Sequence, residues 1–104
     1  IDDLIRAYDM AIRAGVKTRE GIYNIGGGSK NTLSVWAEFG PLLQNLFGKK
    51  ISVSFEDWRP GDQKIFVADI RKAKKEFGWE PKTSVVDGIT KLHKWVTTNA
   101  TLFD

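Results

Sequence analysis

Ile22-Tyr23-Asn24-Ile25-Gly26-Gly27-Gly28 is the stretch that decides the predicted fold, because it joins a short apolar segment to three successive glycines. Its first four residues include two isoleucines and a tyrosine, which is typical of a strand. The glycines supply the backbone freedom that a sharp change of direction needs. The stretch therefore predicts a strand over 22–25 that ends in a tight loop.

Helices are predicted on both sides of this strand. Apolar residues recur at helical spacing over 3–14, and Gly15 marks the end of that helix. A second helix is predicted from an N-cap at Ser34 to Phe47, with Pro41 inside it. A proline inside a helix removes one hydrogen bond, so we expect this helix to bend.

Two more helices are predicted in the last third of the chain. Asp69 caps a short basic helix that ends at Gly78. Ser84, with Asp87 three residues later, resembles a capping box and opens the final helix. Beyond Thr97 the periodicity is lost, and we expect the tail to fray.

Two further extended segments complete the pattern. Alternating apolar and polar residues over 51–55 predict a strand with one buried face, and 65–67 predicts a second short strand. About four helices with these short strands, in a chain of 104 residues, indicate one small mixed α/β domain.

Composition excludes several classes of protein. Hydrophobic residues make up 41% of the chain and charged residues 28%, as in ordinary globular proteins. No apolar run is long enough to span a membrane. The absence of cysteine and the single histidine, His93, exclude a disulfide framework, a thiolate metal site and a multi-histidine metal cluster. A cytoplasmic location is compatible with this composition, and we expect one.

Neither the basic residues nor His93 indicates a catalytic or nucleic-acid site. The net charge of +3 is spread along the chain apart from a run over 71–75, which we interpret as a solvated helix face. His93 has no Ser, Cys or Asp partner at a recognisable spacing. Glycines 26–28 match neither the dinucleotide fingerprint nor the phosphate-loop signature, so a chain reversal is favoured over a phosphate cradle.

Trp58-Arg59-Pro60-Gly61-Asp62-Gln63 carries the candidate binding residues. Pro60 and Gly61 predict a type II turn, which brings Arg59 and Asp62 close together. The Arg59 guanidinium suits phosphate oxygens, and the Asp62 carboxylate suits a ribose diol. Trp58 either stacks on a base or sugar or packs beneath the turn. The alternative is an ordinary surface turn in which the Arg59 and Asp62 side chains pair with each other.

An ordered set of short motifs covers nearly the whole chain. They are Ile1-Asp2-Asp3-Leu4, Tyr23-Asn24-Ile25-Gly26-Gly27-Gly28, Asn31-Thr32-Leu33-Ser34, Arg59-Pro60-Gly61-Asp62, Asp69-Ile70-Arg71-Lys72-Ala73 and Gly78-Trp79-Glu80-Pro81. This succession resembles the C-terminal part of the extended short-chain dehydrogenases/reductases, the group of NAD-dependent sugar-nucleotide epimerases and dehydratases.

The resemblance implies that residues 1–104 are a small mixed α/β substrate-binding domain, with an N-terminal NAD-binding Rossmann domain missing. It implies that Arg59 and Asp62 contact the diphosphate and the ribose of a nucleotide-diphospho-sugar. Asn24 is a further candidate for a substrate contact. NAD is expected in the parent enzyme and not on this chain. Neither nucleic acid nor a membrane is an expected partner.

The chain also departs from the family pattern. It has no Tyr-x-x-x-Lys, because Ile12 stands four residues after Tyr8 and Gly27 four residues after Tyr23. It begins at Ile1 without a methionine. We therefore expect a fragment without catalytic residues or redox activity of its own. The parent enzyme is expected to be a homo-oligomer. The fragment is expected to self-associate through an exposed apolar patch that involves the first helix or the strand at 22–25.

Within the family, two stretches are most similar to the 2-epimerases of CDP-sugars. They are residues 35–43 and 57–63. The 4-epimerases and 4,6-dehydratases share the outer frame of motifs and remain alternatives. A stand-alone nucleotide-binding or interaction module is the alternative from a different class of protein.

Overall fold

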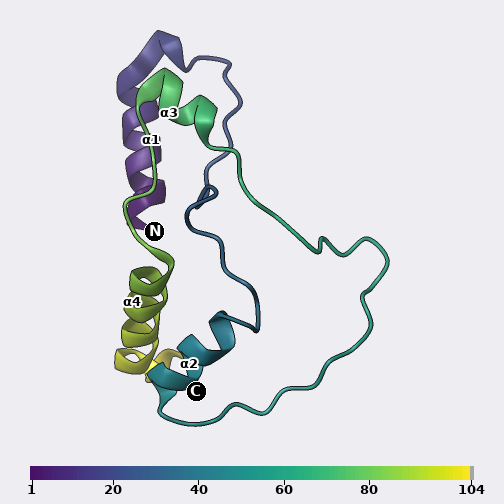
Figure 1. The fold of residues 1–104 in the computed structure, drawn as a ribbon. Coiled ribbons are helices and arrows are strands. Elements are labelled where there is room, and N and C mark those ends of the chain that lie inside the picture. The colour runs from purple at the N-terminus through teal and green to yellow at the C-terminus, as the bar shows by residue number, and fades with distance from the viewer. Residues whose placement is uncertain (104) are drawn as a thin grey trace. The chain divides into compact units, whose positions relative to one another are not determined.

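The computed structural model describes residues 1–103 and is helical, with long irregular connections (Figure 1). Its α-helices are α1 (Asp2–Ala14), α2 (Phe39–Phe47), α3 (Arg71–Phe77) and α4 (Val85–Thr98), and its 3-10 helices are η1 (Gly15–Lys17) and η2 (Ala100–Phe103). The chain divides into two compact units, which are described separately. Unit 1 comprises residues 1–32 and 67–84, and unit 2 comprises residues 33–66 and 85–104.

All four predicted helices are present, but the predicted strands are wrong. Residues 22–25, 51–55 and 65–67 are extended or irregular, and no strand forms anywhere within residues 1–103. A strand is stabilised by hydrogen bonds to a neighbouring strand, and none of these segments has such a neighbour. Of the predicted small mixed α/β domain, the four helices are therefore present within residues 1–103 and the short strands are not.

Unit 1 is built on α1 and α3, which contact each other. Its buried core consists of Ala7 from α1, Ala73 from α3 and Trp79, which is only 1% exposed. Five half-buried side chains pack around this core: Met10, Tyr23, Ile25, Ile70 and Phe77. Small residues on both helices let them approach closely, and the Trp79 indole fills the remaining space.

The carboxylate of Asp3 ties the start of α1 to the segment that follows Trp79. It accepts hydrogen bonds from the backbone N–H of Lys82 at 3.0 Å and of Thr83 at 2.9 Å, and from the Arg6 guanidinium at 2.6 Å. The Trp79 indole N–H donates to the Asp3 carbonyl at 2.9 Å. We call this set of contacts the Asp3 latch.

The Asp3 latch shifts the acid–base equilibrium of its carboxyl group. Burial alone would raise the pKa of Asp3, because it disfavours the charged form. The donors of Thr83, Arg6 and Lys82 stabilise the carboxylate more than burial destabilises it. The pKa of Asp3 therefore lies well below its usual range.

The C-terminal end of α3 follows the sequence prediction, but the N-cap position is Ile70 and not the predicted Asp69. The Asp69 carboxylate, one residue earlier, accepts the Arg71 backbone N–H at 3.0 Å. The Arg71 side chain also binds this carboxylate and, with the backbone bond, lowers the pKa of Asp69 to about 2. Gly78 ends the helix with a φ of 75°, in the left-handed region that glycine adopts most readily.

Unit 2 contains α2 and α4, which contact each other near Phe47 and His93. The two rings meet edge to face with centroids 4.9 Å apart, so His93 is a half-buried packing residue. The tail beyond Thr97 was expected to fray, and up to Phe103 this is wrong. It forms η2, and the Phe103 ring lies 6.1 Å from that of Trp95.

Helix α2 begins at Phe39 after an N-cap at Glu38, four residues later than the predicted N-cap at Ser34. This start places Pro41 in the first turn, where a backbone N–H has no partner within the helix. The bend expected from a proline in the helix interior is therefore wrong, because the proline is not in the interior. Gly48 ends the helix with a φ of 65°.

Candidate functional site

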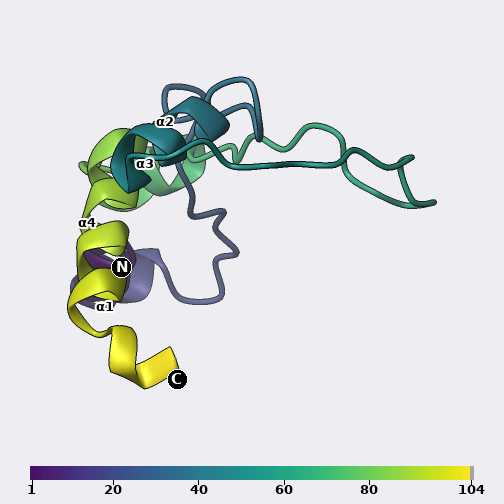
Figure 2. The same cartoon turned by 90° about the horizontal axis from the view of Figure 1, so that it is seen from below.

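The turn at Trp58–Gln63 lies in the long irregular segment that follows α2 within unit 2 (Figures 1 and 2). It has the predicted geometry. The Asp62 N–H donates to the Arg59 carbonyl at 3.1 Å, and Gly61 has a φ of 88°. A positive φ at the third residue, together with this hydrogen bond, matches a type II turn.

A second hydrogen bond closes the same turn from the other side. The Asp62 Oδ2 atom accepts the Arg59 backbone N–H at 2.9 Å. The Asp62 side chain thus binds the backbone of Arg59 and not its guanidinium. Each of these two residues both donates to and accepts from the other, which restrains the turn without any contact from elsewhere in the chain.

The Arg59 guanidinium extends from this closed turn. Within residues 1–103 it takes part in no hydrogen bond or ion pair, and its side chain is exposed. The alternative of a surface turn with paired Arg59 and Asp62 side chains therefore does not match the structure. A guanidinium without a carboxylate partner keeps all its donors available to an anion.

Trp58 lies directly before the turn. Its relative solvent exposure is 62%, so the Trp58 side chain does not pack beneath the turn. The Nζ atom of Lys64 lies 5.4 Å from the centroid of the indole ring, within the range of a cation–π contact. Lys64 is not among the binding residues predicted from the sequence. The available signal was its position two residues after Asp62, which places a second cation beside the turn.

Asn24, the remaining candidate residue, lies in the extended segment of unit 1, and its side chain is exposed. Trp58, Arg59 and Asp62 belong to unit 2 and are described together. Asn24 stays a separate sequence prediction.

The glycines at 26–28 form a chain reversal, which was the favoured interpretation. The Asn31 N–H donates to the Gly28 carbonyl at 3.4 Å, and the Asn31 side-chain amide donates to the Gly27 carbonyl at 3.2 Å. A hollow of about 180 Å³ beside this loop is also lined by Lys74. The Lys74 ammonium already pairs with Glu80 at 2.5 Å, and the next helix starts only at Phe39. The loop therefore lacks the helix N-terminus that a dinucleotide phosphate needs.

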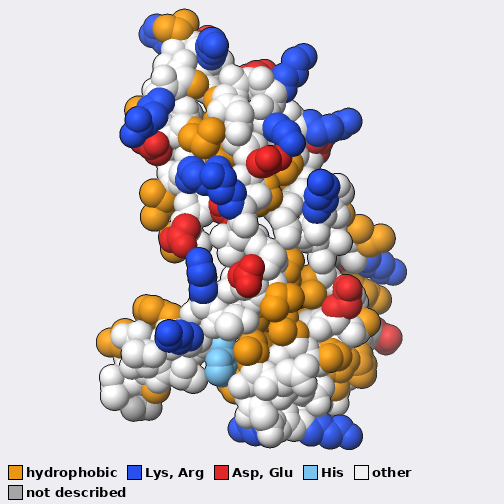
Figure 3. Space-filling model, turned by 60° about the vertical axis from the view of Figure 1, so that its left-hand side comes forward, with side chains coloured by type: hydrophobic (Ala, Val, Ile, Leu, Met, Phe, Trp, Pro, Cys, Tyr) orange, Lys and Arg blue, Asp and Glu red, His pale blue; other side chains and the backbone are white. Residues whose placement is uncertain are grey.

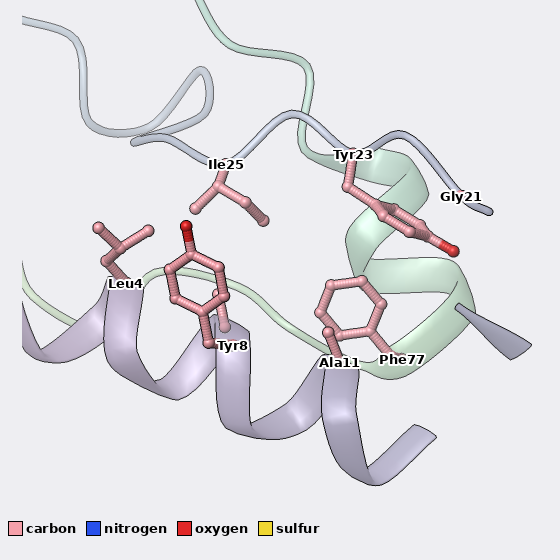
Figure 4. A pocket seen from close by; sticks show the side chains of 8 residues that line it. Leu4, Tyr8, Ala11, Gly21, Tyr23, Ile25 and Phe77 are labelled. Atoms are coloured by element: carbon pink, nitrogen blue, oxygen red, sulfur yellow. The ribbon is translucent and has the colours of Figure 1, made fainter. Parts of the chain in front are cut away.

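A larger hollow in unit 1 is apolar. It measures about 420 Å³ and is lined by Leu4, Ala7, Tyr8, Ala11, Gly21, Tyr23, Ile25 and Phe77. In Figure 4 the side chains of Leu4, Tyr8 and Ala11 extend from α1. Those of Tyr23 and Ile25 come from the extended segment, and that of Phe77 comes from α3. The rings of Tyr23 and Phe77 meet edge to face at 5.1 Å. The hydrogen bond from the Tyr23 hydroxyl to the Glu76 carboxylate raises the pKa of Tyr23.

This hollow continues into exposed apolar surface on α1. Tyr8 is 66% and Ile12 76% exposed, and Figure 3 shows hydrophobic side chains lying between charged ones on the face that it draws. An exposed patch on the first helix was expected from the sequence, and it is present. Self-association through it stays a prediction.

The described chain offers no metal centre and no helix that could span a membrane. Within residues 1–103 no three His, Cys, Asp or Glu side chains gather closely enough to hold a metal ion. None of the helices in that range is long and apolar enough to cross a bilayer. The exposed turn is thus the strongest candidate for a binding site.

The family of the chain follows from comparison with known proteins. Residues 3–92 match the family model of GDP-mannose 4,6 dehydratase, which covers most of the chain. The chain belongs to this family of NAD-dependent epimerases and dehydratases, whose members use NAD(P) and bind nucleotide-sugars.

Three relatives illustrate the range of the family. CDP-paratose 2-epimerase of Salmonella typhi is 34% identical over 92% of this chain and 28% of its own length. UDP-glucuronate 4-epimerase of Thermodesulfobacterium geofontis is 37% identical over 78% of this chain and 24% of its own length. UDP-glucose 4-epimerase of Bacillus subtilis is 30% identical over 95% of this chain and 30% of its own length. The chain thus spans between 24% and 30% of the length of these three relatives.

Proposed function

We propose that this chain is the nucleotide-sugar-binding part of an NAD-dependent nucleotide-sugar epimerase and that the Trp58–Gln63 turn holds the nucleotide. Arg59 binds the diphosphate, Asp62 binds the ribose and Trp58 stacks on the base. The observation that carries the proposal is the doubly closed turn, which leaves the Arg59 guanidinium without a partner among residues 1–103. Asn24 is a further, weaker candidate for a substrate contact.

The proposed role of these residues is binding and positioning. Interactions with the nucleotide, remote from the reacting sugar carbon, supply binding energy that orients the sugar. The turn is suited to this because its two hydrogen bonds fix the backbone before a ligand arrives, which lowers the entropy lost on binding. The chain has no Tyr-x-x-x-Lys, so no proton transfer is assigned to it and we expect it to be inactive alone.

The residues of this chain do not fit NAD. The glycine loop over 26–28 does not have the spacing of a dinucleotide fingerprint. The Asn31 side chain donates a hydrogen bond to the Gly27 carbonyl, and no helix begins directly after the loop. In the whole enzyme, NAD would be held by residues outside this chain, in the larger share of the relatives' length that it does not span.

The particular activity proposed is that of a CDP-paratose (CDP-tyvelose) 2-epimerase. It is supported by the similarity of residues 35–43 and 57–63 and by the 34% identity to CDP-paratose 2-epimerase over 92% of the chain. A 4-epimerase is the second candidate, because UDP-glucuronate 4-epimerase is 37% identical over 78% of the chain. The two candidates differ in the base, so nucleotide preference separates them.

Titration calorimetry of the 104-residue chain with CDP, UDP and dTDP tests the proposal. We expect Arg59→Ala to weaken binding by about 1.5–3 kcal/mol, the value of a hydrogen bond to a charged group. Arg13→Ala is the matched control, because Arg13 is exposed and pairs with Asp9 on α1. A preference for CDP supports the 2-epimerase, and a preference for UDP supports a 4-epimerase. Equal affinities for the Arg59→Ala and Arg13→Ala chains would refute the role of the turn.

Asp62 is tested by two substitutions that separate its contacts. Asp62→Asn keeps an oxygen that accepts the Arg59 N–H, so the turn stays closed and the affinity for inorganic pyrophosphate is retained. The same variant should bind CDP more weakly, because the charged acceptor for the ribose is lost. Asp62→Ala removes the side-chain hydrogen bond and leaves only the backbone one, so the turn is restrained less and binding of both ligands should weaken. If Asp62→Asn binds CDP as the unmodified chain does, Asp62 only shapes the turn.

A further inference from the structure

Lys64 is a cation that no carboxylate neutralises. Glu56, Asp57 and Asp62 all lie within eight residues of it, yet within residues 1–103 Lys64 forms no ion pair. Its ammonium instead lies over the Trp58 ring, 5.4 Å from the ring centroid. An exposed lysine that prefers an aromatic face to nearby acids keeps its full charge available to a ligand.

The contact with Trp58 also restrains where this charge lies. Trp58 directly precedes Arg59 in the sequence, and Arg59 is fixed by the two hydrogen bonds of the turn. The Lys64 ammonium is therefore held beside Trp58, the immediate neighbour of Arg59 in the sequence. Two cations and one exposed indole thus gather on a segment of seven residues, 58–64.

We infer that Lys64 is a second phosphate-binding residue of the nucleotide site, held in place by Trp58, whose other ring face takes the base. This inference rests on the proposed function. A nucleoside diphosphate carries more than one negative charge at neutral pH, so the Arg59 guanidinium alone leaves charge uncompensated. Lys64 supplies the second positive charge. The base stacks on the indole face that the ammonium leaves free, since nucleobases stack on exposed aromatic side chains.

The inference makes different demands on ligands with and without phosphate. CDP uses Arg59, Lys64 and the Trp58 ring, whereas cytidine uses the ring alone and pyrophosphate uses the two cations alone. Lys64→Ala should therefore weaken binding of CDP and of pyrophosphate by about five- to tenfold, as expected for one exposed charge-assisted contact, and leave the affinity for cytidine unchanged. Lys64→Arg keeps the charge and should retain most of the affinity for CDP.

The test is titration of the 104-residue chain with these three ligands at two salt concentrations. Lys49→Ala is the matched control, because Lys49 is an exposed lysine on the same irregular segment but lies outside the turn. We expect CDP affinity to depend less on salt in Lys64→Ala than in Lys49→Ala, since one ionic contact has been removed.

The outcomes separate this inference from the proposed function. If Lys64→Ala and Lys49→Ala bind CDP equally while Arg59→Ala binds it more weakly, Lys64 is not part of the site and the inference is overturned. If Arg59→Ala also binds CDP as the unmodified chain does, the proposed function fails and the inference fails with it. A loss of cytidine affinity in Lys64→Ala equal to the loss for CDP would show that Lys64 only supports the Trp58 ring, which also overturns the inference.

Discussion

Replacing Asp3 by alanine removes the latch that joins α1 to the segment after Trp79. The carboxylate accepts two backbone N–H groups, those of Lys82 and Thr83, and no other acceptor for these N–H groups is present within residues 1–103. Its side chain is 21% exposed, so water replaces it only in part. The Arg6 guanidinium keeps its bond to the Glu80 carbonyl and does not become isolated.

The expected loss of stability follows from these contacts. A hydrogen bond to a charged group contributes about 1.5–3 kcal/mol. Taking the lower value for each of the two backbone donors, because the site is partly solvated, we expect Asp3→Ala to lower the free energy of unfolding by about 3 kcal/mol. A chain of this size has a total stability of about 5–15 kcal/mol, so the variant loses a large share of it.

The latch also predicts how stability depends on pH. The pKa of Asp3 is lowered by folding, so its contribution is fully present above the pKa of the unfolded chain, about 4. The contribution is lost as the pH falls from about 4 toward the lower pKa of the folded state. Asp3→Asn has no carboxylate to protonate. The difference in unfolding free energy between the unmodified chain and Asp3→Asn should therefore shrink as the pH falls below about 4.

Urea unfolding at several pH values measures both effects. Tryptophan fluorescence follows this unfolding, and it includes the signal of Trp79, whose buried indole bonds to the Asp3 carbonyl, beside the signals of the other three tryptophans. Asp9→Ala is the control, since Asp9 forms an exposed pair with Arg13 on the same helix and should change stability by less than about 0.5 kcal/mol. Equal stabilities of Asp3→Ala and Asp9→Ala at neutral pH would refute the reasoning.

Two further substitutions probe unit 1. Trp79→Phe removes the indole donor and leaves a small cavity at a fully buried position, so we expect a loss of about 2 kcal/mol in urea unfolding followed by circular dichroism; a loss under about 0.5 kcal/mol would contradict this. Gly28→Ala should lower the melting temperature more than Gly48→Ala. Both glycines have a positive φ, but a Cβ at Gly28 would lie 2.9 Å from the Ile70 side chain, whereas one at Gly48 meets nothing within 4 Å. Equal decreases in melting temperature for the two variants would show that the positive φ alone, and not the contact with Ile70, determines the loss of stability.

The sequence predicted the helices because their signals are local. The apolar spacing over 3–14 and the stop at Gly15 gave α1, observed as Asp2–Ala14, almost residue for residue. The start of α2 was wrong by four residues because the cap residue Ser34 was weighed without the preference of Pro41 for a first turn. Once Pro41 is placed in the first turn, the observed start at Phe39 follows.

The residues of the candidate site were predicted more completely than the contacts between them. The turn over residues 59–62 was expected, and its backbone geometry is confirmed. The bond from the Arg59 N–H to the Asp62 carboxylate was not foreseen, because the sequence does not show which of several donors a carboxylate will choose. Lys64 was missed for a similar reason. Its contact with Trp58 depends on side-chain rotamers, which residue spacing does not fix.

One physical cause explains both the failed strands and the successful turn. The hydrogen bonds of the turn close within four residues, so residue types alone determine them. The hydrogen bonds of a strand need a second strand at the right distance, and residues 51–55 have none within the described chain. Among residues 51–66 the bond between the Asp62 N–H and the Arg59 carbonyl is the one backbone hydrogen bond that the structure contains. The proposed binding element is therefore also the one part of this segment whose backbone is organised without a tertiary partner, and that is the property a preformed nucleotide contact requires.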